Sequence, residues 1–263
     1  MHHASFDDAV FRASYVREPA TFCVKCHAPE DRTLSGRPST LASLGTACTS
    51  CHLGHEKTFA DSRACAGCHE FPFPGRETSP KLGDQMQRTI SEHAFSAEAS
   101  VSCASCHMPV VDGPHGKHKS HTFGGGADPS WIRTALDVRA SREGARVTIT
   151  LAPGHVGHAV PTGDLFRRLE VGADALDESG AVIGRAVFPV GRTFATTPRG
   201  ERIEIADNRP GAHPGDVTRV VLDFGDVKPA RVRWSIDFER VLGQSPDAVE
   251  IASRLRVMEG WID

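Results

Sequence analysis

The stretch Phe22–Glu30, FCVKCHAPE, places two cysteines three residues apart and a histidine directly after the second. The same five-residue pattern, Cys-x-x-Cys-His, returns three more times before residue 108. The pattern's cysteines are Cys23, Cys26, Cys48, Cys51, Cys65, Cys68, Cys103 and Cys106, and its histidines are His27, His52, His69 and His107. Every cysteine of the chain belongs to one of these four motifs.

Paired Cys-x-x-Cys segments have three interpretations. Structural zinc would use two pairs for each Cys₄ site, but it would not explain the histidines. A disulfide within each pair would close a very short, strained loop. With 14 histidines in 263 residues, four coincidental matches have a chance of roughly 1 in 10⁵, so the pattern is interpreted as the attachment motif of a c-type haem.

Helical geometry explains the spacing within each motif. Residues i, i+3 and i+4 of a helix lie at neighbouring positions on one surface. Two thiols can therefore add to the vinyl groups of one haem while the adjacent imidazole reaches its iron. The sequence predicts four covalently bound haems c, with the eight cysteines as cofactor-binding residues and the four motif histidines as proximal iron ligands.

Each iron needs a second axial ligand or stays open for chemistry. Ten histidines lie outside the motifs against four methionines, which favours bis-histidine ligation. Asp84 resembles an N-cap, and the helix expected to follow it would turn His93 inward on a stripe with Met86. The remaining distal candidates are His55 after the second motif, His121 with His118 as its alternative, His158 with His155, and His3 beside His2.

Residues 1–128 show poor periodicity and contain loop signals such as DRTLSGRPST and FPFPGRETSP. Four haems in so short a segment would form most of its hydrophobic core. We therefore expect a mixed fold that begins with a haem-packed, loop-rich α-helical domain over residues 1–128. Without haem, this part of the chain is not expected to fold.

From about residue 130 the cysteines stop and strand patterns begin. VRWSIDF alternates apolar side chains (Val232, Trp234, Ile236, Phe238) with polar ones, as a half-buried strand does. Similar alternation occurs in Val147/Ile149/Leu151, Leu169/Val171/Ala173, Ile203/Ile205, Val220/Leu222/Phe224 and Leu255/Val257. Turn signals such as DESG and NRPG separate these segments, so residues 129–263 are predicted to form an antiparallel β-sandwich.

No catalytic constellation is visible among the predicted strands. Arg167 and Arg168 follow the turn GHAVPTGD and are either surface charges or partners of haem propionates. The net charge of −3, from 30 basic and 33 acidic residues, excludes a basic nucleic-acid surface. No apolar run approaches the about 20 residues that a transmembrane helix requires.

The N-terminal stretch MHHASFDDAV lacks the basic and apolar regions of a secretory signal. Haem attachment nevertheless takes place on the exported side of a membrane. The protein is therefore expected to be periplasmic or extracellular, and its gene to encode residues upstream of Met1.

The chain resembles multihaem cytochromes c related to the tetrahaem cytochrome of ammonia oxidisers, a group with haem arrangements similar to those of nitrite reductase and hydroxylamine oxidoreductase. The resemblance rests on CTSCH, EHAFSAEASVSCASCHMP, HKSHTFGGG and GHAVPTGDLFRRLEV. It implies that His93 and His158 are distal haem ligands. It also implies that MHHASFDDAVFRAS is similar to a segment that commonly follows an earlier haem motif. No such motif precedes it here, so the roles of His2 and His3 stay open.

We expect an electron-transfer protein rather than an enzyme, in which closely spaced bis-histidine haems form a wire. The alternative is a multihaem redox enzyme with one open haem that acts on a small nitrogen or sulfur compound. A third interpretation makes the sandwich a binding domain for a protein or cell-surface partner. The expected partners are redox proteins, with a homo-oligomer or filament left open, and no nucleic acid.

Overall fold

The computed structural model describes residue 2 and residues 4–17, 20–31, 39–52, 62–126, 128–245 and 248–263. The chain divides into two compact units, Met1–Phe71 with Ser100–Gly124, and Pro72–Ala99 with Gly125–Asp263. The segment 72–99, which the sequence pattern assigned to the first domain, thus groups with the strands that follow residue 130. The predicted domains 1–128 and 129–263 stay a prediction, because compactness does not test independent folding.

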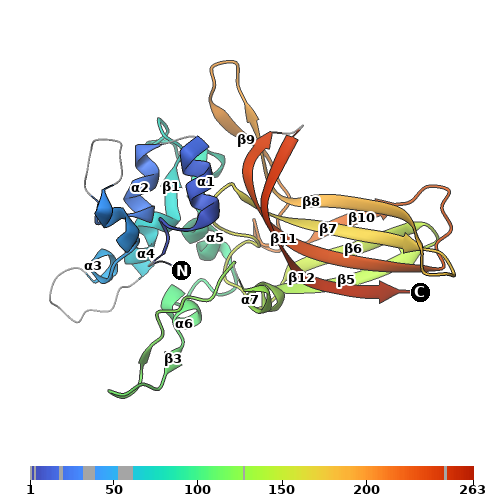
Figure 1. The fold of residues 1–263 in the computed structure, drawn as a ribbon, viewed down its shortest axis with the longest axis horizontal. Coiled ribbons are helices and arrows are strands. Elements are labelled where there is room, and N and C mark those ends of the chain that lie inside the picture. The colour runs from blue at the N-terminus through green and yellow to red at the C-terminus, as the bar shows by residue number, and fades with distance from the viewer. Residues whose placement is uncertain are drawn as a thin grey trace. The chain divides into compact units, whose positions relative to one another are not determined.

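The first unit is built of short helices joined by loops (Figure 1). Its elements are α1 (Ala9–Arg17), α2 (Thr21–His27), the 3₁₀ helix η1 (Thr40–Leu44), α3 (Cys48–Cys51), α4 (Ser62–His69), α6 (Cys103–His107) and a hairpin of β3 (Val110–Val111) with β4 (His118–Lys119). Four of these helices contain the two cysteines of a motif, and the motif histidine is either the last helical residue or, after α3, the C-cap. The helical turn expected at each motif is confirmed.

The described apolar core of the first unit is small. Phe6, Ala28 and Ala42 are its buried members, with Phe11 and Val24 packed against them. A unit of this length ordinarily requires a larger apolar core to offset the entropy of ordering the chain. Protein side chains in the described part of this unit therefore account for little of its stability.

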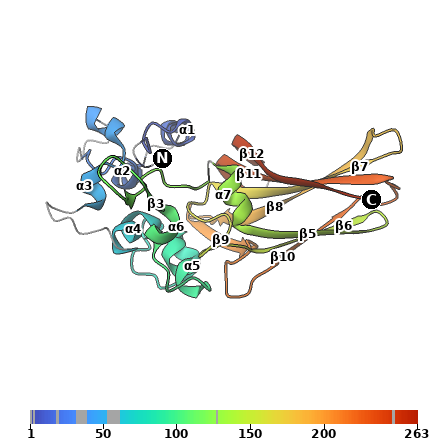
Figure 2. The same cartoon turned by 90° about the horizontal axis from the view of Figure 1, so that it is seen from below.

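Two antiparallel sheets dominate the second unit and lie one above the other (Figure 2). The first has the strand order β12-β11-β7-β8-β9, and the second has the order β10-β6-β5. The strands are β5 (Leu136–Glu143), β6 (Arg146–Pro153), β7 (Arg167–Leu176), β8 (Val182–Thr196), β9 (Arg202–Asp207), β10 (Thr218–Asp223), β11 (Arg231–Ser245) and β12 (Ala248–Ile262). The helix α7 (Pro129–Thr134) precedes them, capped by the Asp128 carboxylate, which accepts a hydrogen bond from the Ser130 N–H.

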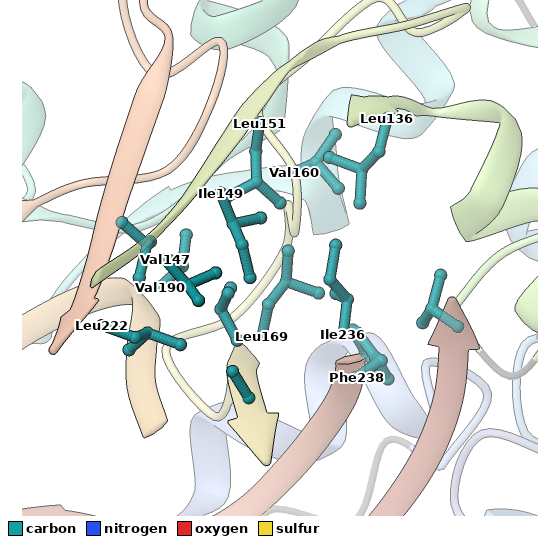
Figure 3. Close-up of a cluster of buried hydrophobic side chains, with 14 of the residues drawn as sticks. Leu136, Val147, Ile149, Leu151, Val160, Leu169, Val190, Leu222, Ile236 and Phe238 are labelled. Atoms are coloured by element: carbon teal, nitrogen blue, oxygen red, sulfur yellow. The ribbon is translucent and has the colours of Figure 1, made fainter. Parts of the chain in front are cut away.

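Inward-facing side chains from both sheets form one hydrophobic cluster (Figure 3). On β6, Val147, Ile149 and Leu151 have no exposed surface. On β11, Val232, Ile236 and Phe238 are buried as expected. Trp234 is only half-buried, and Asp237, which was expected to face outward, is 3% exposed, so the alternation expected for VRWSIDF is confirmed only in part. Ile205 differs, because it is 55% exposed on β9, one of the two edge strands of its sheet, and the prediction that it faces inward is wrong.

The strand β1 (Glu70–Pro72) ends at the first residue of the second unit. The elements that follow it within residues 72–99 are the 3₁₀ helix η2 (Leu82–Asp84), β2 (Gln85–Arg88) and α5 (Thr89–Phe95). The predicted helix that starts at Asp84 is therefore wrong over its first turn.

Contacts with the strands explain why the helix starts late. The Asp84 carboxylate accepts hydrogen bonds from Arg76 and from Ser79 Oγ instead of capping a helix. The guanidinium of Arg88 binds Glu204 and Asp207, and this tertiary contact holds the preceding residues extended. The helix forms only after Arg88, since tertiary contacts override a local helix signal.

Candidate functional site

The motif cysteines of the first unit lie near one another. Helix α4 contacts both α2 and α6. All eight cysteines are present as thiols, and none of them is fully buried. A hydrogen bond between the Cys26 and Cys68 thiols raises the pKa of Cys26 and lowers the pKa of Cys68 to about 7. Burial raises the pKa of Cys51, with a further contribution from the nearby Cys68.

The zinc interpretation requires four ligands around one ion. Within the described residues, no group of three or more His, Cys, Asp or Glu side chains is arranged to hold a metal ion. The cysteine pairs, all of which belong to the described part of the chain, are not gathered here as four ligands of one ion, and the choice between zinc and haem stays a prediction.

Two motif histidines have the tautomer of a metal ligand. His27 Nδ1 lies 2.9 Å from the Ser5 carbonyl, and His107 Nδ1 lies 3.1 Å from the Gly124 carbonyl. A carbonyl only accepts, so each Nδ1 carries the proton and the lone pair is on Nε2. Histidines that ligate metals almost always donate their other ring N–H in this way.

Two histidine pairs in the first unit have the same spacing. The ring centroids of His52 and His121 are 6.1 Å apart with an interplanar angle of 44°. Those of His2 and His69 are also 6.1 Å apart, with an angle of 68°. Since a bond between a metal and an imidazole nitrogen is about 2 Å long, two imidazoles on opposite sides of one ion have centroids about 6 Å apart. Each pair joins a motif histidine to a histidine outside the motifs.

In the second unit, His93 on α5 lies against the turn GHVGHAVPTGD. Its Nδ1 donates to the Gly157 carbonyl at 2.7 Å. A Cβ atom on residue 157 would come within 2.8 Å of that Nδ1, so the close approach requires glycine at this position. His158 Nδ1 lies 3.0 Å from the Ala159 carbonyl. Both predicted ligands thus have the Nδ1–H donation that suits ligation through Nε2.

A buried charge network connects the same helix and turn. Glu92, only 3% exposed, accepts hydrogen bonds from Arg209 Nη2 and Thr162 Oγ1, each at 2.6 Å. Arg209 also donates to the Pro161 carbonyl at 2.7 Å. The network therefore connects Glu92, the neighbour of His93 on α5, to Thr162 directly and to Pro161 through Arg209.

The charges of this network extend along β9 from Glu204 to Asp207. Its members are the cations Arg88, Arg192 and Arg209 and the anions Glu92, Glu204 and Asp207. Burial alone would lower the pKa of Arg209, but the charges of Glu92 and Asp207 raise it above its ordinary value. Burial alone would raise the pKa of Asp207, and its hydrogen bond and charge contact with Arg209 lower it instead. Local sequence patterns give no sign of this network, because its hydrogen-bonded partners, such as Arg88 and Asp207, are as much as 119 residues apart.

Other predicted site residues have simpler surroundings. His118 and His155 are exposed. Arg168 pairs with the fully buried Glu239 at 2.6 Å, so it is not a plain surface charge, while Arg167 lies 3.6 Å from Asp164. His55 and His3 lie outside the described residues, and their predicted roles stay predictions.

Comparison with known proteins relates the chain to cytochromes c. No family model matches it. It is 23% identical over 160 residues to a high-molecular-weight cytochrome c from Nitratidesulfovibrio vulgaris (strain Hildenborough), in an alignment that covers 50% of this chain and 28% of that protein. The chain therefore matches well under half of that relative's length.

The solved structures add evidence on the fold. The crystal structure of a penta-heme cytochrome c552 from Thermochromatium tepidum matches with a TM-score of 0.70 at 17% identity, covering 100% of this chain and 93% of that chain. MtrC from Shewanella baltica OS185 matches with a TM-score of only 0.22, too low to indicate a shared fold. The resemblance to multihaem cytochromes c is thus confirmed, whereas the narrower resemblance to the tetrahaem cytochrome of ammonia oxidisers stays a prediction. In sequence the chain is similar to a high-molecular-weight cytochrome c, and it has the fold of a penta-haem cytochrome c552.

Proposed function

We propose that the chain is a c-type cytochrome that carries electrons through four covalently bound, mostly bis-histidine haems. The observation that carries the proposal is the presence of four Cys-x-x-Cys-His motifs, each on its own helical turn. When bound, haem supplies an iron centre whose reduction potential depends on its axial ligands and burial. The residues of the chain attach, orient and bury it.

The motif residues suit covalent attachment. Each thiol adds across a vinyl double bond, with sulfur bonding to one carbon and the hydrogen to the other, so no oxidant is needed. None of the cysteines is fully buried, and Cys48 and Cys106 are exposed, which leaves their sulfurs accessible to a group held against the helices. The small described core of the first unit also favours a large apolar group as a main component of its interior.

The distal ligands in this proposal are His121, His93 and His158. His121 would serve the iron of His52, since the rings are spaced as two ligands of one ion. His93 and His158 donate through Nδ1 and would ligate through Nε2. Histidine at both axial positions gives low-potential haems suited to electron transfer rather than an open iron suited to substrate binding.

The proposed surroundings follow from the attachment chemistry. Thioether formation requires reduced cysteines and haem delivered to the exported side of a membrane, so the protein would be periplasmic or extracellular. None of the helices in the described part of the chain is long and apolar enough to cross a membrane. The partners would be redox proteins that donate and accept single electrons, and a homo-oligomer or filament stays a prediction.

Counting covalent haems tests the proposal. The mass of the denatured protein is expected to exceed that of the polypeptide by four haem masses, and acid-acetone should extract no haem. A variant with Cys48→Ala and Cys51→Ala is expected to retain three haems, whereas the matched variant Thr49→Ala with Ser50→Ala retains four. Extraction of the haem, or zinc in place of haem, would refute the proposal.

Removing His121 tests bis-histidine ligation. The variant His121→Ala is expected to keep four covalent haems but to convert one of them to a high-spin form that binds CO, because that iron loses its sixth ligand. His118→Ala is the control, since this histidine lies on β4 three residues before His121, is exposed as His121 is, and has its Nδ1 3.4 Å from the Gly116 carbonyl. It should leave the spectrum low-spin. Direct packing of the two rings gives a similar centroid distance, and in that case the spectrum of His121→Ala would be unchanged.

A further inference from the structure

We propose that His2 is the distal ligand of the haem held by Cys65, Cys68 and His69. The inference rests on the proposed function, since it requires a haem at this motif. The ring centroids of His2 and His69 are 6.1 Å apart, the same separation as that of His52 and His121. This separation suits two imidazoles on opposite sides of one iron.

The backbone holds His2 firmly at this position. Its carbonyl accepts hydrogen bonds from the Ser5 N–H at 3.1 Å and from the Thr46 N–H at 3.0 Å. Ser5 in turn donates through Oγ to the His27 carbonyl and accepts from His27 Nδ1. Hydrogen bonds therefore connect the N-terminal turn to His27 of the first motif and to Thr46, which precedes the second motif. These bonds hold the backbone of His2 in place.

One nitrogen of the His2 ring lacks, among the described residues, the hydrogen-bond partner that its burial requires. Nδ1 is buried and has no hydrogen-bond partner within the described part of the chain. Leaving a buried polar atom unsatisfied costs about 1–3 kcal/mol, so native proteins almost always supply a partner. On another side, the ring packs edge-on against Phe123 with centroids 4.3 Å apart. A haem between His2 and His69 would supply the missing polar partner, either as iron or as a propionate beside it.

The neighbouring His3 gives the experiment its control. His3 is likewise a distal candidate from the sequence, and the two histidines are adjacent with the same side chain. The holoprotein with His2→Ala is expected to show one high-spin, CO-binding haem among four. The holoprotein with His3→Ala should stay as low-spin as the unchanged protein. Added imidazole should restore the low-spin spectrum of His2→Ala, because it fills the open position.

The outcomes separate this inference from the proposed function. Four covalent haems by mass in both variants keep the proposed function intact, and a fully low-spin His2→Ala then overturns the inference alone. Conversion by His3→Ala instead would also overturn it. If His2→Ala yields no holoprotein, His2→Met decides. A methionine ligand should keep all irons low-spin but raise the midpoint potential of one haem, and an unchanged set of four potentials contradicts ligation by residue 2.

Discussion

Replacing Arg209 with methionine is expected to lower the free energy of unfolding of the second unit by about 3–5 kcal/mol, the usual cost of breaking a buried ion pair from one side. Arg209 is 2% exposed and binds two carboxylates, Glu92 at 2.6 Å and Asp207 at 2.8 Å. Its removal leaves their charge buried with less compensation. Urea unfolding followed by far-ultraviolet circular dichroism of the strands measures the change.

Arg139→Met is the matched control for this prediction. Arg139 is 84% exposed on β5 and lies 3.9 Å from Asp137, an arrangement in which an ion pair contributes at most about 1 kcal/mol. A loss for Arg209→Met no larger than that of the control would show that the network is not structural.

The effect should also depend on pH. The native pKa of Asp207 is lowered, so its contribution is present above the ordinary aspartate value of 3.8 and is lost as the pH falls through the native pKa. The difference between the unchanged protein and Arg209→Met is therefore expected to be largest near neutral pH and to shrink in acid. A difference in the free energy of unfolding that is the same at every pH would contradict this expected pH dependence.

Replacing all eight motif cysteines with alanine is expected to leave the first unit unfolded while the second unit keeps its sheets. The described core of the first unit consists of a few side chains around Phe6. Burying an apolar side chain contributes about 1.5–3 kcal/mol, whereas ordering each residue costs about 1–2 kcal/mol in backbone entropy. The second unit instead shares one continuous cluster between two sheets.

Hydrogen exchange measured by mass spectrometry distinguishes the two units. In the cysteine-free variant, amides in residues 4–17, 20–31 and 100–124 should exchange at the rate of an unfolded chain, while β6 and β11 stay protected. The control replaces only Cys103 and Cys106, which should leave most of the first unit protected. Full protection of the first unit without any cysteine would show that side-chain packing alone maintains it.

Much of the site could be predicted from local sequence. The distance from Cys23 to Cys26 and His27 is a property of one helical turn, and the same holds for the other motifs. Alternating side chains such as those of β6 reveal which face of a strand is buried, because the period of a strand is independent of the rest of the fold. Helix starts were less predictable, since Arg88 is held extended by Glu204 and Asp207, which lie more than 100 residues later.

By itself, the sequence determined that the two cysteines and the histidine of each motif share one helical turn, and it determined where most strands form. Both features depend on residues within a few positions of one another. Only the tertiary structure decided which outlying histidine faces which motif. It brought His2 to His69 and His121 to His52, and it set His93 against Gly157. It also assembled Glu92 and Arg209 into a buried pair. These pairings depend on the path of the chain between distant segments, and side-chain spacing along the sequence carries no information about that path.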